Sequence, residues 1–243
     1  AVLAVSLNHL KNKEVRIQMK GFRPNPEIIG QIYEIGLPAI VMQAIGSAMN
    51  YGMNRILITF SSTATAVFGV YFKLQSFVFM PVFGLNNGVT PIIAYNYGAQ
   101  NKERVVSTIR HVVTYAVIVM LLGLAAFQLL PRQLLLMFDA SETMLALGIP
   151  ALRVISLSFL LASFGVAASG AFQALGKSIY SMYVSVARQL VVLLPAAFLL
   201  AQTGRVELVW WAYPIAELVS FAMSVIFMVH INRKIISKIG KKS

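Results

Sequence analysis

The chain of 243 residues is 58% hydrophobic and only 12% charged, with a mean hydropathy of +0.76, whereas soluble domains are about 25% charged. This composition indicates a polytopic membrane protein and argues against a soluble enzyme. The net charge is +12, but the Lys and Arg residues gather at the ends of apolar runs, which is typical of membrane topology and does not predict nucleic-acid binding.

Two segments are predicted to precede the membrane bundle. Residues 1–10 are apolar but too short to cross a bilayer, and no charged region precedes them as in a signal peptide. We interpret them as the end of a preceding transmembrane helix, and the chain as a fragment of a longer protein. Residues 11–34 are predicted to form a basic cytoplasmic linker. It closes with a short interfacial helix that starts at Asn25-Pro26-Glu27.

The first full span is predicted over residues 35–60. Gln43, Asn50 and Asn54 recur along one face of this helix, together with the small residues Gly46 and Ser47. A polar stripe in a membrane helix faces protein or water and not lipid. The stripe therefore either lines a cavity or makes hydrogen bonds to neighbouring helices.

The second span is predicted over residues 66–97, after an uncharged outer turn at 61–65. It carries candidate lining residues and candidate hinge residues: Gln75, Asn86 and Asn87 in the first group, and Pro81, Gly84, Gly88 and Pro91 in the second. Each proline removes a backbone donor and bends or loosens its helix. Such a helix packs inside a bundle, where it forms either a transport site with its hinge or a kinked structural helix.

Four further spans are predicted, at residues 112–130, 147–175, 178–201 and 208–231, followed by a basic tail at 232–243. The predicted outer turns hold only Arg132 and Arg205 among Lys and Arg, and the predicted cytoplasmic segments hold most of the others. This bias predicts that the C-terminus lies in the cytoplasm.

Two charges are expected near the middle of the membrane. Arg188 lies about ten residues into its span from the cytoplasmic side, and Glu217 about ten residues into the next span from outside. Adjacent antiparallel helices could pair them, because a lone charge at that depth costs at least about 2.5–3.5 kcal/mol. The pair either fixes two helices or acts as a proton- or cation-linked switch.

Part of the second span carries a specific resemblance. The pattern consists of Met80-Pro81, Gly84-Leu85, Gly88, Thr90-Pro91 and Tyr95-Asn96-Tyr97-Gly98-Ala99. It resembles the segment that closes the eighth membrane helix of multidrug and toxic compound extrusion (MATE) transporters. The resemblance implies an all-α polytopic bundle in which residues 35–231 form the six-helix C-terminal lobe of a 6+6 transporter. It also implies that residues 11–34 join this lobe to a missing N-terminal lobe.

By the same resemblance, the function would be export of small organic cations or drugs by alternating access, in exchange for Na⁺ or H⁺. Gln43, Asn50, Asn54, Gln75, Asn86 and Asn87 would then line or adjoin the cavity. The protein would lie among lipids in the plasma membrane, taken as a bacterial inner membrane. Some branches of the family place coupling acids in helices seven and ten, but the corresponding spans here contain none. The coupling ion therefore stays open.

Other functions are not excluded by the sequence. A flippase of lipid-linked substrates from the same superfamily is one alternative, and a channel or a non-transporting scaffold is another. We expect no enzymatic activity, because no nucleophile elbow or phosphate loop is present. We expect no cofactor and no metal site, because the chain has no cysteine and its three histidines lie at predicted helix ends.

Overall fold

A computed structural model describes residues 24–240. The chain divides into two units, residues 1–36 and 37–243, and the bundle described below belongs to the second unit. The segments predicted at residues 1–10 and 11–23, and the end of the tail at 241–243, lie outside the described residues. Within the described part, every regular element is helical, as the sequence predicts.

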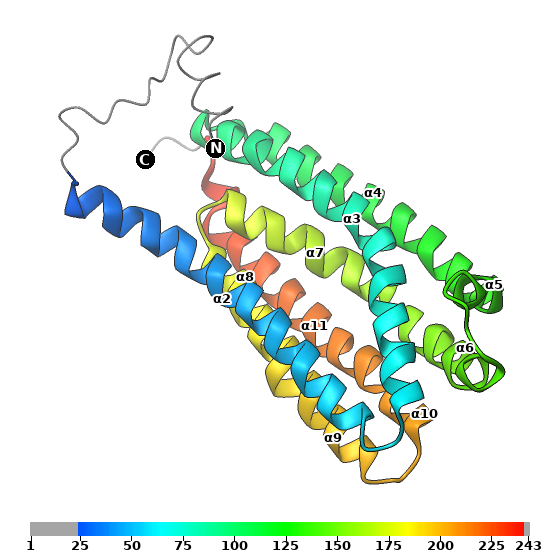
Figure 1. The fold of residues 1–243 in the computed structure, drawn as a ribbon. Helices are drawn as coiled ribbons and strands as arrows, with labels where there is room; N and C mark the ends of the chain where they lie inside the picture. The colour runs from blue at the N-terminus through cyan, green and yellow to red at the C-terminus, as the bar shows by residue number, and fades with distance from the viewer. Residues whose placement is uncertain (1–23, 241–243) are drawn as a thin grey trace, which may run out of the picture. The chain divides into compact units, whose positions relative to one another are not determined.

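The bundle contains long helices joined by short connections (Figure 1). In chain order the elements are α2 (Pro26–Leu57), α3 (Ser62–Gly98), α4 (Lys102–Leu129), α5 (Pro131–Leu136), α6 (Glu142–Ser156), α7 (Phe159–Ala174), α8 (Ser178–Val186), the π-helical η1 (Ala187–Leu193), α9 (Leu194–Ala201), α10 (Val206–Val209), α11 (Ala212–Lys234) and the 3-10 turn η2 (Ile236–Lys238).

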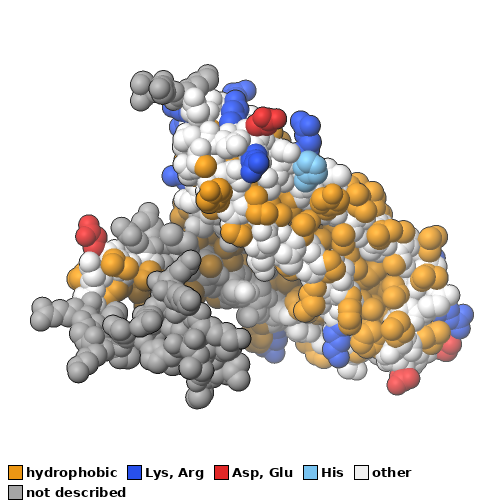
Figure 2. Space-filling view, turned by 90° about the horizontal axis from the view of Figure 1, so that it is seen from above, with side chains coloured by type: hydrophobic (Ala, Val, Ile, Leu, Met, Phe, Trp, Pro, Cys, Tyr) orange, Lys and Arg blue, Asp and Glu red, His pale blue; other side chains and the backbone are white. Residues whose placement is uncertain are grey.

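Four stretches are long and apolar enough to cross a membrane: Ser62–Gly98, Lys102–Leu129, Ser178–Ala201 and Val206–Lys238. The pair α6–α7 passes the same test as one broken span. Hydrophobic side chains cover a broad part of the face seen in Figure 2, and charged side chains are few there. The prediction of a multi-pass helix bundle is confirmed. The count of six spans stays a prediction, because α2 is long enough at 32 residues but is not among the stretches that pass.

One predicted boundary is wrong. The outer turn predicted at 61–65 lies earlier, between the end of α2 at Leu57 and the start of α3 at Ser62, where the Ser61 side chain accepts a hydrogen bond from the Ala64 N–H at 3.0 Å. The predicted interfacial helix falls in the first part of α2 (Pro26–Leu57), and its position at the membrane interface stays a prediction.

The span predicted at residues 147–175 is broken in the structure. It corresponds to α6 and α7, and the chain bends by 51° between them. The hydroxyls of Ser156 and Ser158 donate to the carbonyls of Arg153 and Ile155, at 3.0 and 2.6 Å. Such local bonds compete with the regular helical pattern. Gln128 of α4 also donates to the Arg153 carbonyl, at 2.8 Å.

Two apolar clusters hold the bundle together. The larger cluster joins α3, α4, α6 and α7 around edge-to-face aromatic rings, with Phe159 5.1 Å from Phe127 and 5.5 Å from Phe79. The smaller cluster joins α3, α4, α7, α11 and η2 through residues such as Ile93, Phe172 and Ile236. Helix α3 lies against both α4 and α7, which places its polar residues at the edge of the core.

Candidate functional site

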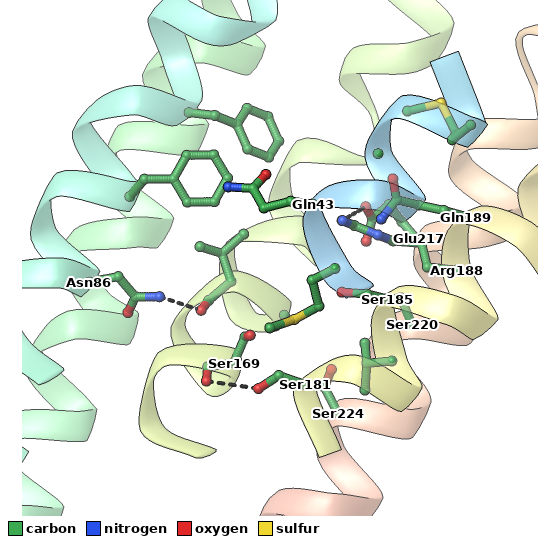
Figure 3. A pocket seen from close by; sticks show the side chains of 18 of the residues that line it. Gln43, Asn86, Ser169, Ser181, Ser185, Arg188, Gln189, Glu217, Ser220 and Ser224 are labelled. Carbon is green, nitrogen blue, oxygen red and sulfur yellow. Dashed lines mark hydrogen bonds and ion pairs between the residues drawn. The ribbon is translucent and has the colours of Figure 1, made fainter. Parts of the chain in front are cut away.

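A cavity of about 620 Å³ lies inside the second unit. Its wall is built from α2, α3, α7, α8, η1 and α11. One part of the wall is apolar and rich in Met and Phe, including Met42, Met49, Phe72, Phe79 and Phe83. The other part carries amides, hydroxyls and two charges, and the close-up in Figure 3 shows side chains from several helices around the space. An apolar pocket with a few convergent polar groups is the usual form of a small-molecule site.

The two charges of the wall form an ion pair. Arg188 Nη1 donates to Glu217 Oε1 at 2.7 Å, across η1 and α11. The Arg188 side chain is 30% exposed and the Glu217 side chain 12%. Figure 3 shows the pair beside Gln189, at the end of the cavity away from Ser169 and Ser181. The structure thus joins the two charges that sequence reasoning placed at the same depth of the membrane.

The backbone that carries Arg188 is π-helical from Ala187 to Leu193. Pro195 explains why the helix loosens here: it has no N–H, so the carbonyl of Val191 lacks its normal i+4 donor. A π-helical turn holds more residues than an α-helical turn, and such turns are frequent at functional sites. Both Arg188 and its neighbour Gln189 line the cavity.

Asn86 holds α3 against α7 in the cavity wall. Its side-chain amide donates to the carbonyl of Val166 at 2.7 Å. The close approach of α3 to α7 requires a glycine at position 170, since a Cβ at Gly170 would overlap the Asn86 amide. A similar serine bond joins the next pair of helices: Ser181 of α8 donates to the Ser169 carbonyl of α7 at 3.0 Å.

Four of the six predicted lining residues border this cavity: Gln43, Gln75, Asn86 and Asn87. Asn50 and Asn54 are not among the lining residues, and Asn54 instead donates to the Asn50 carbonyl of its own helix at 2.9 Å. Their contribution to a transport site stays a prediction.

The predicted hinge residues lie inside α3, which remains helical throughout. Figure 1 shows that α3 changes direction along its length, as expected for a helix that contains Pro81 and Pro91. A Cβ at Gly84 or Gly88 would meet no atom within 4 Å, so close packing does not explain these two glycines. Their function as hinges stays a prediction.

Sequence reasoning missed several lining residues, chiefly serines and one tyrosine: Ser169, Ser181, Ser185, Gln189, Tyr213, Ser220 and Ser224. A signal was available on α11, where Tyr213, Glu217, Ser220 and Ser224 follow one another at helical spacing and share one face. Serine is also common where membrane helices simply pack closely, so it predicts a cavity poorly by itself.

The described residues contain no cluster of three or more His, Cys, Asp or Glu side chains that could hold a metal ion. Glu217 is the one acidic residue among those that line the cavity in the described part of the chain. The arrangement suits recognition of a compact, partly apolar molecule by a few polar contacts.

The comparisons with known proteins agree with this architecture. The chain is 27% identical over 230 residues to multidrug export protein MepA of Staphylococcus haemolyticus, covering 94% of this chain and 50% of the relative. It is also 27% identical over 218 residues to the MepA protein of Staphylococcus aureus strain NCTC 8325, covering 89% of this chain and 48% of the relative. The chain therefore spans about half the length of the curated relatives that it matches.

Solved structures share the fold. A crystal structure of MATE in complex with MaL6 superimposes with a TM-score of 0.86 at 24% identity, over 99% of this chain and 54% of that one. A MOP superfamily transporter from Pyrococcus furiosus superimposes with a TM-score of 0.85 at 23% identity. The sequence between residues 38 and 199 matches the MatE family. Since this region covers most of the chain and most of the helices of the bundle, the chain belongs to the MatE family.

Proposed function

We propose that the chain forms one lobe of a secondary transporter that exports small organic cations, and that the cavity of this lobe is part of the substrate pathway. The observation that carries the proposal is a cavity with polar and charged walls inside a membrane bundle of the MatE family. Intramembrane charges are expensive and are kept mainly where they line a pathway or pair with one another. The relatives named multidrug export proteins support drugs as the substrate class.

A second lobe completes the transporter in this proposal. The chain covers 50% of the MepA relative, and transporters of this kind bind substrates at the interface between two repeats. Export would proceed by alternating access, as the two lobes rock about the cavity in exchange for Na⁺ or H⁺. The protein would lie in the plasma membrane with its C-terminus in the cytoplasm, as the distribution of Lys and Arg predicts.

The first test is the intact mass of the native polypeptide in its source membrane. A mass near twice 26.6 kDa supports the two-lobe proposal. A mass near 26.6 kDa contradicts it, and would require two copies of the chain to enclose a central pathway.

The second test is transport by that polypeptide in proteoliposomes. Ethidium, a fluorescent organic cation, should move saturably, and an imposed Na⁺ or H⁺ gradient in the opposite direction should drive it. Movement that does not saturate and does not respond to either gradient would contradict antiport and favour a channel. Comparison of the two gradients identifies the coupling ion.

A further inference from the structure

The Arg188–Glu217 pair is incompletely satisfied. A single bond joins the two groups, from Nη1 to Oε1. Arg188 Nε and Glu217 Oε2 are buried, and neither has a hydrogen-bond partner within the described part of the chain. A bidentate pair would use two nitrogens of the guanidinium and both oxygens of the carboxylate. The pair therefore does not have the geometry of a saturated structural bridge, and each group keeps a free bonding position.

The two partners differ in how readily they could separate. Arg188, at 30% exposure, faces the open space more than Glu217, at 12%. A displaced guanidinium could therefore be hydrated in the cavity, whereas the carboxylate would stay in the wall. Arg188 also lies on the π-helical segment. A change there from π-helical to α-helical hydrogen bonds, which span five and four residues, would rotate the side chain.

The surroundings of Glu217 contain further unused polar atoms. Tyr213 lies one turn before it and Ser224 two turns after it on the same face of α11, and both residues line the cavity. The Tyr213 Oη and Ser224 Oγ atoms are buried without a hydrogen-bond partner in the described residues. The Tyr213 ring packs edge-on against Tyr71 of α3, at 5.6 Å between centroids. A carboxylate with an aromatic residue one turn away on the same cavity wall suits a positively charged ligand that carries apolar groups.

We propose that Glu217 is a cation-binding residue of this cavity, and that Arg188 occupies it as a tethered competitor until a monovalent organic cation takes its place. The inference rests on the proposed function for its ligand class. It adds the residue that holds the charge in this lobe, and an intramolecular cation that lowers the affinity. Arg188 would thereby discriminate against weakly bound cations.

The test is binding of tetraphenylphosphonium, a permanent organic monocation, to the purified full chain in detergent, measured by equilibrium dialysis against empty micelles. Arg188→Gln should bind about tenfold more tightly, a factor that corresponds to about 1.4 kcal/mol. Glu217→Gln should bind about tenfold more weakly. The double variant should bind as weakly as Glu217→Gln, because the competitor has no effect once the carboxylate is gone.

A matched control removes a different cation from the same bundle. Lys73→Gln on α3 changes the net charge as Arg188→Gln does, but Lys73 does not line the cavity and instead lies 5.8 Å from the Phe138 ring centroid. Binding by this variant should equal that of the unmodified chain. An equal gain in Lys73→Gln and Arg188→Gln would reduce the effect to net charge and overturn the proposal.

A purely structural pair gives the opposite pattern. Both single variants would then bind more weakly, and the charge-neutral double variant would recover binding. That result overturns the proposal, as does any Arg188→Gln chain that binds no more tightly than the unmodified chain, including the case in which neither binds. Elution volume and melting temperature check folding. If Arg188→Gln does not fold, Arg188→Met takes its place. If Glu217→Gln does not fold, the double variant takes its place.

Binding and transport separate this inference from the proposed function. Suppose that Arg188→Gln binds more tightly and Glu217→Gln more weakly, but the native polypeptide does not transport. That result would reject the transporter proposal and leave the binding assignment intact. Saturable transport with unchanged binding in Arg188→Gln would reject only the assignment.

Discussion

Two apolar stretches of the bundle show how similar compositions give different structures. Helix α4 and the stretch Ser178–Ala201 are both long and apolar enough to cross a membrane. Helix α4 is one uninterrupted α-helix, whereas the second stretch passes through the π-helical η1 and carries Arg188 into the cavity. Apolar composition therefore predicts that a stretch crosses the membrane. The second stretch differs from α4 by Pro195 and by the polar residues Arg188 and Gln189, which line the cavity.

The largest expected effects test how α3 packs against α4 and against α7, which lines the cavity. A Cβ at Gly170 would overlap Asn86 on the cavity side, and a Cβ at Gly123 would overlap Val78 on the α4 side. Gly170→Ala and Gly123→Ala should each destabilise the chain by about 1–3 kcal/mol. Only Gly170→Ala should also change tetraphenylphosphonium binding, since only it disturbs the Asn86–Val166 bond.

The stability of the two glycine variants is measured by the melting temperature in detergent, and their tetraphenylphosphonium binding by equilibrium dialysis. Gly165→Ala is the control on the same helix as Gly170, because a Cβ there would lie 3.7 Å from Ser220 Oγ, an ordinary contact distance. A loss of stability in Gly165→Ala as large as that in Gly170→Ala would contradict the close approach of α3 and α7.

A smaller effect is expected where α4 contributes a polar group to the bend between α6 and α7. The Gln128 amide donates to the Arg153 carbonyl at 2.8 Å and to Ser156 Oγ at 3.0 Å. Gln128→Leu should destabilise the chain by about 1–2 kcal/mol, because carbonyls at the bend lose a donor. Thermal unfolding measures the loss. Gln202→Leu, in the exposed turn after α9, should leave the melting temperature nearly unchanged, and equal losses would argue against the bend.

The smallest effect is expected at the start of α3. Ser61 accepts a hydrogen bond from the Ala64 N–H at 3.0 Å, so Ser61→Ala should cost about 1 kcal/mol. The neighbouring exposed residue offers the control: Ser62→Ala should change the melting temperature by less. A reversed order would indicate that α3 starts at another residue.

The fold was largely predictable from the sequence because apolar runs of sufficient length have few alternatives in a membrane. The span predicted at residues 178–201 begins where α8 begins, at Ser178, and ends where α9 ends, at Ala201. The bend after Ser156 was not predictable, since it depends on hydroxyl bonds and on Gln128 from a distant helix.

The candidate site was predictable in part. Gln43 and Asn86 stand out as amides in apolar helices, and both line the cavity. Asn54 has the same signal but bonds to its own helix, so residue type alone cannot separate lining from local bonding. Pro195 predicts a loosened backbone in the turn before it, but a proline alone does not predict a π-helical turn, since Pro81 and Pro91 lie in a helix that stays α-helical.

The central claim is that α2, α3, α7, α8, η1 and α11 enclose a water-accessible cavity, and that the exposed apolar residues of α4 lie outside it. The chain has no cysteine, so single cysteines can report solvent access without background. In lipid vesicles, cysteines at Gln43 and Ser185 should react rapidly with a charged, water-soluble thiol reagent. Cysteines at Ile118 and Leu122, exposed on α4, should react slowly. Equal rates at the four positions, or faster reaction on α4, would contradict the claim.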